Sequence, residues 1–206
     1  MRSALLIASL ALAFTTSEKM FSQQTPQSSQ QEAEAVVIRL YQHVVSRKPL
    51  GIPLGKDRKA IWPLLSRNLI ERMTVAEECE KDYFRHYPDP NLKPEFGWLE
   101  SGLFSGANEQ ADPSRFEVRR IVKQADGSYQ VNVKLTYWPD FDKYRSPRGP
   151  RYDWNWEVIV SVIPDGGHFA VNEVLYSQVH PEDAELRLSQ LLSHGCDNGK
   201  WVGYSE

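Results

Sequence analysis

Residues 129–137 decide the fold of this chain, with the sequence Tyr129-Gln130-Val131-Asn132-Val133-Lys134-Leu135-Thr136-Tyr137. Large apolar side chains alternate with polar ones along the whole stretch, which is the period of a β-strand with one buried and one solvated face. The dipeptide Asp126-Gly127 comes just before it and favours a tight hairpin turn. The stretch therefore predicts a strand that pairs with its neighbours in an antiparallel sheet.

Three further stretches around this strand show the same alternation. Apolar and charged residues alternate over 116–122, and apolar side chains recur at every second position of 154–162. A second Asp-Gly turn at 165–167 then leads into an apolar stretch over 168–176. We expect about four strands, joined in chain order.

Helical periodicity lies on both sides of these strands. Residues 31–47 place one apolar stripe on a helix: Val37, Leu40, Tyr41, Val44 and Val45. Ser66 is a suitable N-cap for a helix that stops before Pro88, and Pro181 begins a last helix for which Gly195 is a suitable end. This order predicts an α+β fold, with N-terminal helices packed on a curved antiparallel sheet (a cone), a C-terminal helix and a loop insertion at 88–114.

The composition is that of an ordinary globular protein. The chain has 206 residues, 41% of them hydrophobic, with 24 basic and 27 acidic side chains and a net charge of −3. These values exclude a largely disordered chain, a coiled coil and a polytopic membrane protein. The near-neutral balance also argues against a general nucleic-acid binder, which carries a basic excess.

The first 22 residues are typical of a secretory signal peptide. Arg2 gives a basic start, and 4–14 is an apolar run that is too short to span a membrane. Residues 23–30 hold Gln, Ser, Thr and Pro, which predicts a flexible leader before a single domain over 31–206. We therefore expect an exported protein, periplasmic or extracellular, with no membrane span once residues 1–22 are cleaved.

Two cysteines lie in the mature chain, Cys79 and Cys196. An exported protein meets an oxidising environment, in which an even pair is typical of a disulfide. The alternative is two separate thiols, and the sequence gives no separation that would decide between them.

The order of elements resembles the nuclear transport factor 2-like superfamily, an α+β cone also called cystatin-like. The resemblance lies in the helix residues 33–45, in Trp62-Pro63-Leu64-Leu65-Ser66, and in the final hairpin at 166–176. It is nearest to a group of exported bacterial proteins of unknown function, through residues 98–104 and the tail around Gly195-Cys196 and Trp201-Val202-Gly203. The resemblance implies a cone with a pocket. It implies no activity, because the superfamily includes enzymes, ligand binders and interaction domains.

Most catalytic and metal patterns are missing from the sequence. No nucleophile elbow or His-rich metal motif is present, and Arg145 and Arg151 stand where a calcium loop from Asp140 needs Gly and Glu. The acidic residues at 77–82 are typical of a solvated helix face. The basic residues at 143–151, with aromatics among them, are typical of a solvated loop, and the alternative is a loop that meets phosphate or an acidic partner. We expect no metal, no cofactor and no nucleic acid.

The pocket of the expected cone is the remaining place for a site. Strict alternation puts Glu173 on the face of Phe169 and Val171, where it could act as a general base, unless a bulge turns it outward or an arginine pairs with it. His86 is a second candidate at the pocket mouth. Aromatic side chains could line a ligand site or simply form core: Tyr83, Trp98, Tyr137, Trp154 and Trp156.

Three classes of function follow from these features. The first is an exported non-catalytic domain that binds a small ligand or a protein. The second is an isomerase or lyase that uses Glu173 or His86 as its base, and the third is an envelope interaction or immunity-type protein. The orientation of Glu173 separates the first two. The sequence favours a protein that is not an enzyme. It does not identify the partner, and it does not decide whether the chain forms a homodimer.

Overall fold

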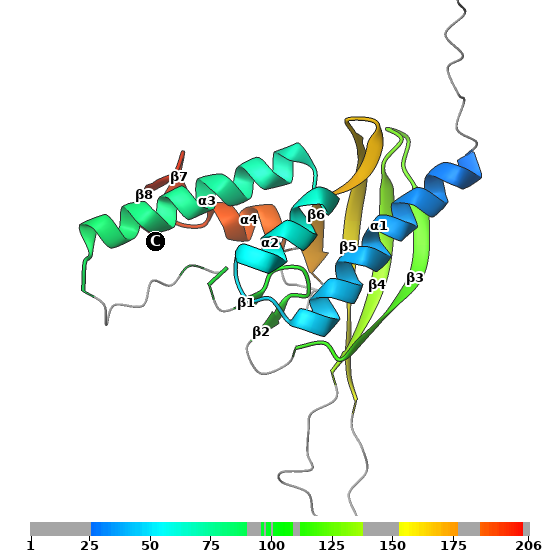
Figure 1. The fold of residues 1–206 in the computed structure, drawn as a ribbon, viewed down its shortest axis with the longest axis horizontal. Coiled ribbons are helices and arrows are strands. Elements are labelled where there is room, and N and C mark those ends of the chain that lie inside the picture. The colour runs from blue at the N-terminus through cyan, green and yellow to red at the C-terminus, as the bar shows by residue number, and fades with distance from the viewer. Residues whose placement is uncertain are drawn as a thin grey trace, which may run out of the picture.

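The computed structural model describes residues 26–89, 96, 98–99, 101–108, 112–137, 153–176 and 186–203 (Figure 1). The elements in chain order are α1 (Pro26–Arg47), α2 (Gly55–Ile61), the 3-10 helix η1 (Trp62–Leu64), α3 (Arg67–His86), β1 (Ser101–Gly102), β2 (Ala107–Asn108), β3 (Arg115–Lys123), β4 (Tyr129–Tyr137), β5 (Trp154–Asp165), β6 (His168–Tyr176), α4 (Leu188–Ser193), β7 (Cys196–Asp197) and β8 (Lys200–Trp201). The expected α+β fold is confirmed: helices precede a four-stranded antiparallel sheet, and a short helix follows it.

The large sheet has the order β3-β4-β5-β6, and every neighbouring pair is antiparallel. The alternation of β4 is confirmed, because Val131, Val133 and Leu135 are fully buried on the inner face, which α1 covers. The sheet does not close on itself. Its edge strand β3 is bulged between Val118 and Arg120, so Arg119 stands outside the regular pairing.

Helix α1 lies across the inner face of the sheet and contacts all four strands (Figure 1). It begins at Pro26, so residues 26–30, expected to be part of a flexible leader, are helical. The hydroxyls of Ser29 and Tyr129 are 2.8 Å apart in a hydrogen bond, which attaches this polar first turn to β4. Residues 1–25, with the expected signal peptide, lie outside the described residues.

Ser66 joins the helical layer to the last strand. Its hydroxyl accepts a hydrogen bond from the backbone N–H of Leu69 at 3.1 Å, which confirms it as the N-cap of α3. Its own backbone N–H donates to the carbonyl of Val171 at 2.8 Å. The start of α3 is therefore fixed against the edge of β6.

The C-terminal segment folds back onto α3, with β7 and β8 forming a two-stranded hairpin there. The disulfide between Cys79 and Cys196 is confirmed, and their Cα atoms are 6.0 Å apart. Gly195 ends α4 with a φ of +72°, and the Trp201 ring lies where a β-carbon at this position would stand. Pro181, the expected start of the last helix, lies outside the described residues.

Candidate functional site

A turn from the 88–114 insertion fills the space between α1 and the sheet. The small hairpin of β1 and β2 carries this turn, and Leu103, Phe104 and Ser105 are each 1% exposed. Where the sequence predicts a pocket between helix and sheet, Leu103 and Phe104 are part of the main hydrophobic cluster. The inner face is thus packed with protein at the level of the turn.

Three aromatic side chains donate hydrogen bonds to three successive carbonyls of this turn. Tyr176 Oη donates to the Leu103 carbonyl at 2.6 Å, and Tyr41 Oη donates to the Phe104 carbonyl at 2.7 Å. The indole N–H of Trp156 donates to the Ser105 carbonyl at 2.7 Å. These donors come from α1, β5 and β6, so both the helical layer and the sheet hold the turn. The three buried carbonyls therefore have hydrogen-bond partners.

Burial keeps the two tyrosines in the role of donors. Desolvation raises the pKa of Tyr41 far above its usual value of 10.0, because Tyr41 is fully buried. Desolvation also raises the pKa of Tyr176, and the nearby Tyr41 and Glu173 raise it further. Both phenols therefore stay protonated at neutral pH and cannot act there as phenolate bases.

Gly106 ends the turn against the ring of Tyr176 on β6. A β-carbon at this position would lie 2.7 Å from Cδ1 of Tyr176, and the φ of Gly106 is +65°. Only glycine fits without a shift of the ring or of the turn.

A bulge in β6 turns Glu173 away from the inner face. Ser161 pairs with Glu173 and Val162 pairs with Val171, so Asn172 is an extra residue and the alternation changes phase after it. Glu173 Oε1 accepts hydrogen bonds from the backbone N–H groups of Val174 and Ser189, both at 3.1 Å. The carboxylate therefore caps the first turn of α4 on the outer side, which is the bulged alternative that the sequence left open.

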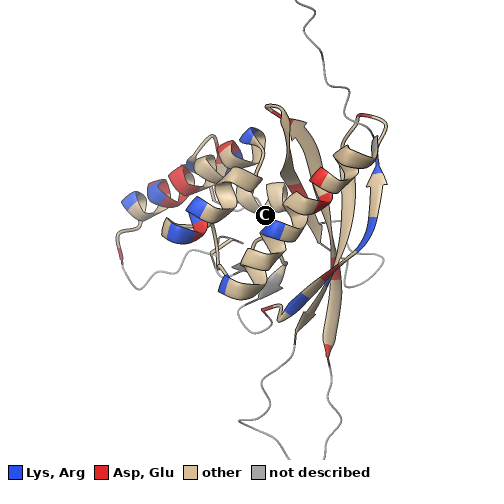
Figure 2. Ribbon diagram, turned by 45° about the vertical axis from the view of Figure 1, so that its right-hand side comes forward, with Lys and Arg blue, Asp and Glu red and all other residues tan. Residues whose placement is uncertain are grey.

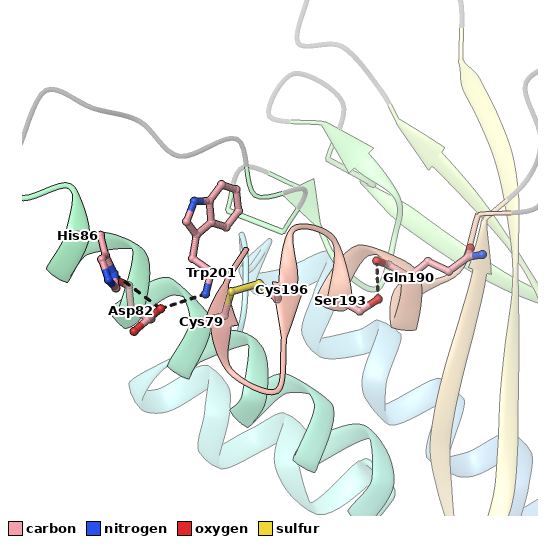
Figure 3. The surroundings of a disulfide bond; sticks show 7 residues. All are labelled: Cys79, Asp82, His86, Gln190, Ser193, Cys196 and Trp201. Carbon is pink, nitrogen blue, oxygen red and sulfur yellow. Dashed lines mark hydrogen bonds and ion pairs between the residues drawn. A yellow bond between two sulfur atoms is a disulfide. The ribbon is translucent and has the colours of Figure 1, made fainter. Parts of the chain in front are cut away.

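His86 lies at the far end of α3, in a different part of the molecule from α4. Its Nδ1 is 2.9 Å from the backbone carbonyl of Asp82, and its side chain is about two-thirds exposed (Figure 3). No described contact joins it to Glu173. The structure thus does not bring the two candidate bases together.

The five candidate aromatic residues fall into three separate places. Tyr83 and Trp98 both pack against Phe96, with ring centroids 5.5 and 4.4 Å away, in a cluster that also holds Trp201. Tyr137 and Trp154 pair at 5.9 Å at the far end of β4 and β5, where Trp154 is 58% exposed. Trp156 is the donor to the turn, so the five rings do not line one wall.

Sequence reasoning misses Asp82, because the pattern at 77–82 predicts a solvated acidic face. Asp82 is 3% exposed, and its carboxylate accepts a hydrogen bond from the backbone N–H of Trp201 at 3.1 Å (Figure 3). Arg85 and Lys200 also contact it, at 3.0 and 3.5 Å. The solvated-face interpretation is also wrong for Glu77, which is only partly exposed and forms an ion pair with Arg58. The sequence offers one sign of this role, which is that Asp82 lies three residues after Cys79. Its hydrogen-bond partner, Trp201, is too distant in the chain for a local pattern to reveal it.

The contacts of Asp82 predict a pH-dependent stability. The Trp201 N–H, and then Lys200, hold the pKa of Asp82 below its usual value of 3.8, so its stabilising effect is complete above 3.8 and is lost as the pH falls through the lowered pKa. We expect Asp82→Asn to lower the melting temperature at pH 7 by several degrees, and the difference from wild type to shrink below pH 3.8. Glu78→Gln, on the same helix but exposed, should melt like wild type at each pH. A difference for Asp82→Asn that is constant down to pH 2 would contradict this role.

Two grooves flank the turn of the β7–β8 hairpin, where it lies on α3. The first groove, about 440 Å³, lies between α3 and the segment from α4 to β7, and both apolar and polar residues line it, among them Val75, Leu192, Arg72 and Asn198. The basic groove, about 640 Å³, lies between α3 and the hairpin turn, lined by Glu78, Lys81, Phe84, Arg85, Asn198, Gly199 and Lys200. The disulfide and Asp82 attach the hairpin that separates the grooves to α3.

A comparison of the chain with protein-family models, with curated proteins and with solved structures finds no match. The likeness to the nuclear transport factor 2-like superfamily therefore stays a prediction. Within the part of the chain that the structure describes, no group of three His, Cys, Asp or Glu side chains is placed to hold a metal ion. Every described helix is too short or too polar to cross a membrane.

Proposed function

We propose that this chain is an exported, non-catalytic domain that binds a partner on its outer surface, at the face formed by α3 and the β7–β8 hairpin. The observation that carries this proposal is the filled inner face, where the turn 103–106 occupies the place of a pocket and three aromatic donors hold it. The commitment of Glu173 to α4 supports the same conclusion, because it removes the best candidate base from the interior.

Two features support export. The N-terminal 22 residues have the pattern of a signal peptide, and the mature chain contains a buried disulfide, which is typical of proteins that fold in an oxidising compartment. Fusing residues 1–22 to an alkaline phosphatase that lacks its own signal should give active, shortened reporter in the periplasm of a bacterial host. Inactive, full-length reporter in the cytoplasm would contradict export.

Mapping of small-molecule fragments by NMR tests where the protein binds. We expect the shifted backbone resonances to fall on α3 and on residues 196–201, and the indole N–H of Trp156 to stay unchanged. A fragment that shifts Trp156 and the Leu103–Ser105 amides would show that the interior opens to ligands. That result would favour the isomerase or lyase alternative. If the Glu173→Gln variant also lost binding of the fragment, Glu173 would be identified as the base of that enzyme.

A further inference from the structure

The basic groove differs from the rest of the molecule in charge. Three of its lining side chains are cationic, Lys81, Arg85 and Lys200, and one is a carboxylate, Glu78. The whole chain has the opposite sign, with a net charge of −3. Figure 2 shows Lys and Arg residues (blue) on the end of α3 that lies farthest from the sheet.

The cations of the groove remain available to a partner. Arg85 and Lys200 contact the buried carboxylate of Asp82 beneath them, but their side chains are 67% and 65% exposed. Among the described residues, Lys81 makes no ion pair within 4.0 Å, and its one recorded electrostatic interaction is with the neighbouring Glu80. Asp82 thus positions two of the cations at the rim without covering them, and Lys81 adds a charge that Asp82 does not contact.

An exposed aromatic ring lies among these charges. Phe84 lines the groove and is 41% exposed, on the same helix as Lys81 and Arg85. The other large apolar side chains of α3 are buried or partly buried, whereas Phe84 is exposed. Its contact with water is unfavourable. An apolar side chain of a partner would cover it.

We propose that the basic groove binds an acidic peptide segment that carries a large apolar side chain. This inference rests on the proposed function and adds the chemistry of the partner. The carboxylates of the segment pair with Lys81, Arg85 and Lys200, and its apolar side chain packs on Phe84. A single aromatic ring that lines a groove among cations suits one peptide side chain better than a membrane surface, which needs several apolar groups that protrude.

Fluorescence anisotropy with a labelled peptide of Glu, Asp and Phe tests the inference on the full mature protein. We expect saturable binding that weakens with added salt, and a loss of about tenfold in affinity for Lys81→Glu/Lys200→Glu. The matched control is Lys56→Glu/Lys59→Glu on α2, which changes the net charge equally outside the groove and should bind like wild type. Phe84→Ser should weaken binding, whereas Leu54→Ser, another exposed apolar position, should not.

Several results would overturn the inference. Equal losses in the two double variants would show that only net charge matters. Binding to vesicles of phosphatidylglycerol without binding to the peptide would identify a membrane surface instead. Absence of peptide binding, together with fragment shifts on α3 and the hairpin, would refute the acidic partner and leave the proposed function standing. Fragment shifts at Trp156 would instead refute the proposed function.

Discussion

Replacing both Cys79 and Cys196 by Ser is expected to lower the free energy of unfolding by about 5 kcal/mol. The bridge joins residues that are 117 positions apart, so it removes a large loop entropy from the unfolded chain. For a domain of this size, the melting temperature should fall by about 10–20 °C. Urea unfolding followed by tryptophan fluorescence measures the change, and reduction of the wild-type protein should reproduce it.

A local effect should accompany the global one. Cys196 begins the hairpin whose Trp201 N–H donates to Asp82, so the amide of Trp201 should exchange with solvent much faster in the double variant. Cys79→Ala/Cys196→Ala controls for the cost of placing a serine hydroxyl at the fully buried position 79. An unchanged melting curve in reducing agent, with two free thiols found by titration, would contradict the bridge.

Phe104→Ala is expected to lower the free energy of unfolding by about 3–5 kcal/mol, because it removes a ring that is 1% exposed from the packed inner face. The variant should also contain an apolar cavity beside Tyr41 and the sheet. Benzene or xenon should bind there and raise the stability of the variant, but not that of wild type.

Phe84→Ala is the matched control, since it removes the same ring from a position that is 41% exposed. It should cost about 1 kcal/mol or less. Equal losses for the two variants, or binding of benzene by wild type, would mean that the turn 103–106 does not fill the interior. The proposal of a binding domain with a closed inner face would then fail as well.

Local patterns in the sequence predicted most of the fold. The alternation of 129–137 and the two Asp-Gly turns gave the strands, and Ser66 and Gly195 gave helix ends, because each depends on neighbours within a few residues. The sequence predicts the start of α1 at residue 31, which is five residues later than its start at Pro26. Its first turn is polar, and the contact that fixes it, from Ser29 to Tyr129, joins residues a hundred positions apart.

The candidate site was harder to predict, since it depends on contacts between distant segments. The carbonyls of Leu103 and Phe104 meet Tyr176 and Tyr41, and no periodicity marks a turn that will be buried. Asp82 looked like its acidic neighbours because its partner, Trp201, is far along the chain. The sequence predicts the bulge at Asn172 only as an alternative. Its one indication is that strict alternation would place the charged Glu173 on the apolar face of the strand.

The irregular edge of β3 bears on whether two copies of this protein can join their sheets. An open strand edge can pair with another molecule and start aggregation. In β3, the extra residue Arg119 interrupts the row of backbone hydrogen-bonding groups. Arg115, Arg120 and Lys123 add exposed positive charges, and the single exposed carboxylate, Glu117, is paired with Arg119. The excess of positive charge and the interrupted backbone both disfavour the pairing of two such edges. We therefore expect self-association through a joined sheet to be suppressed, so that any homodimer forms through another face.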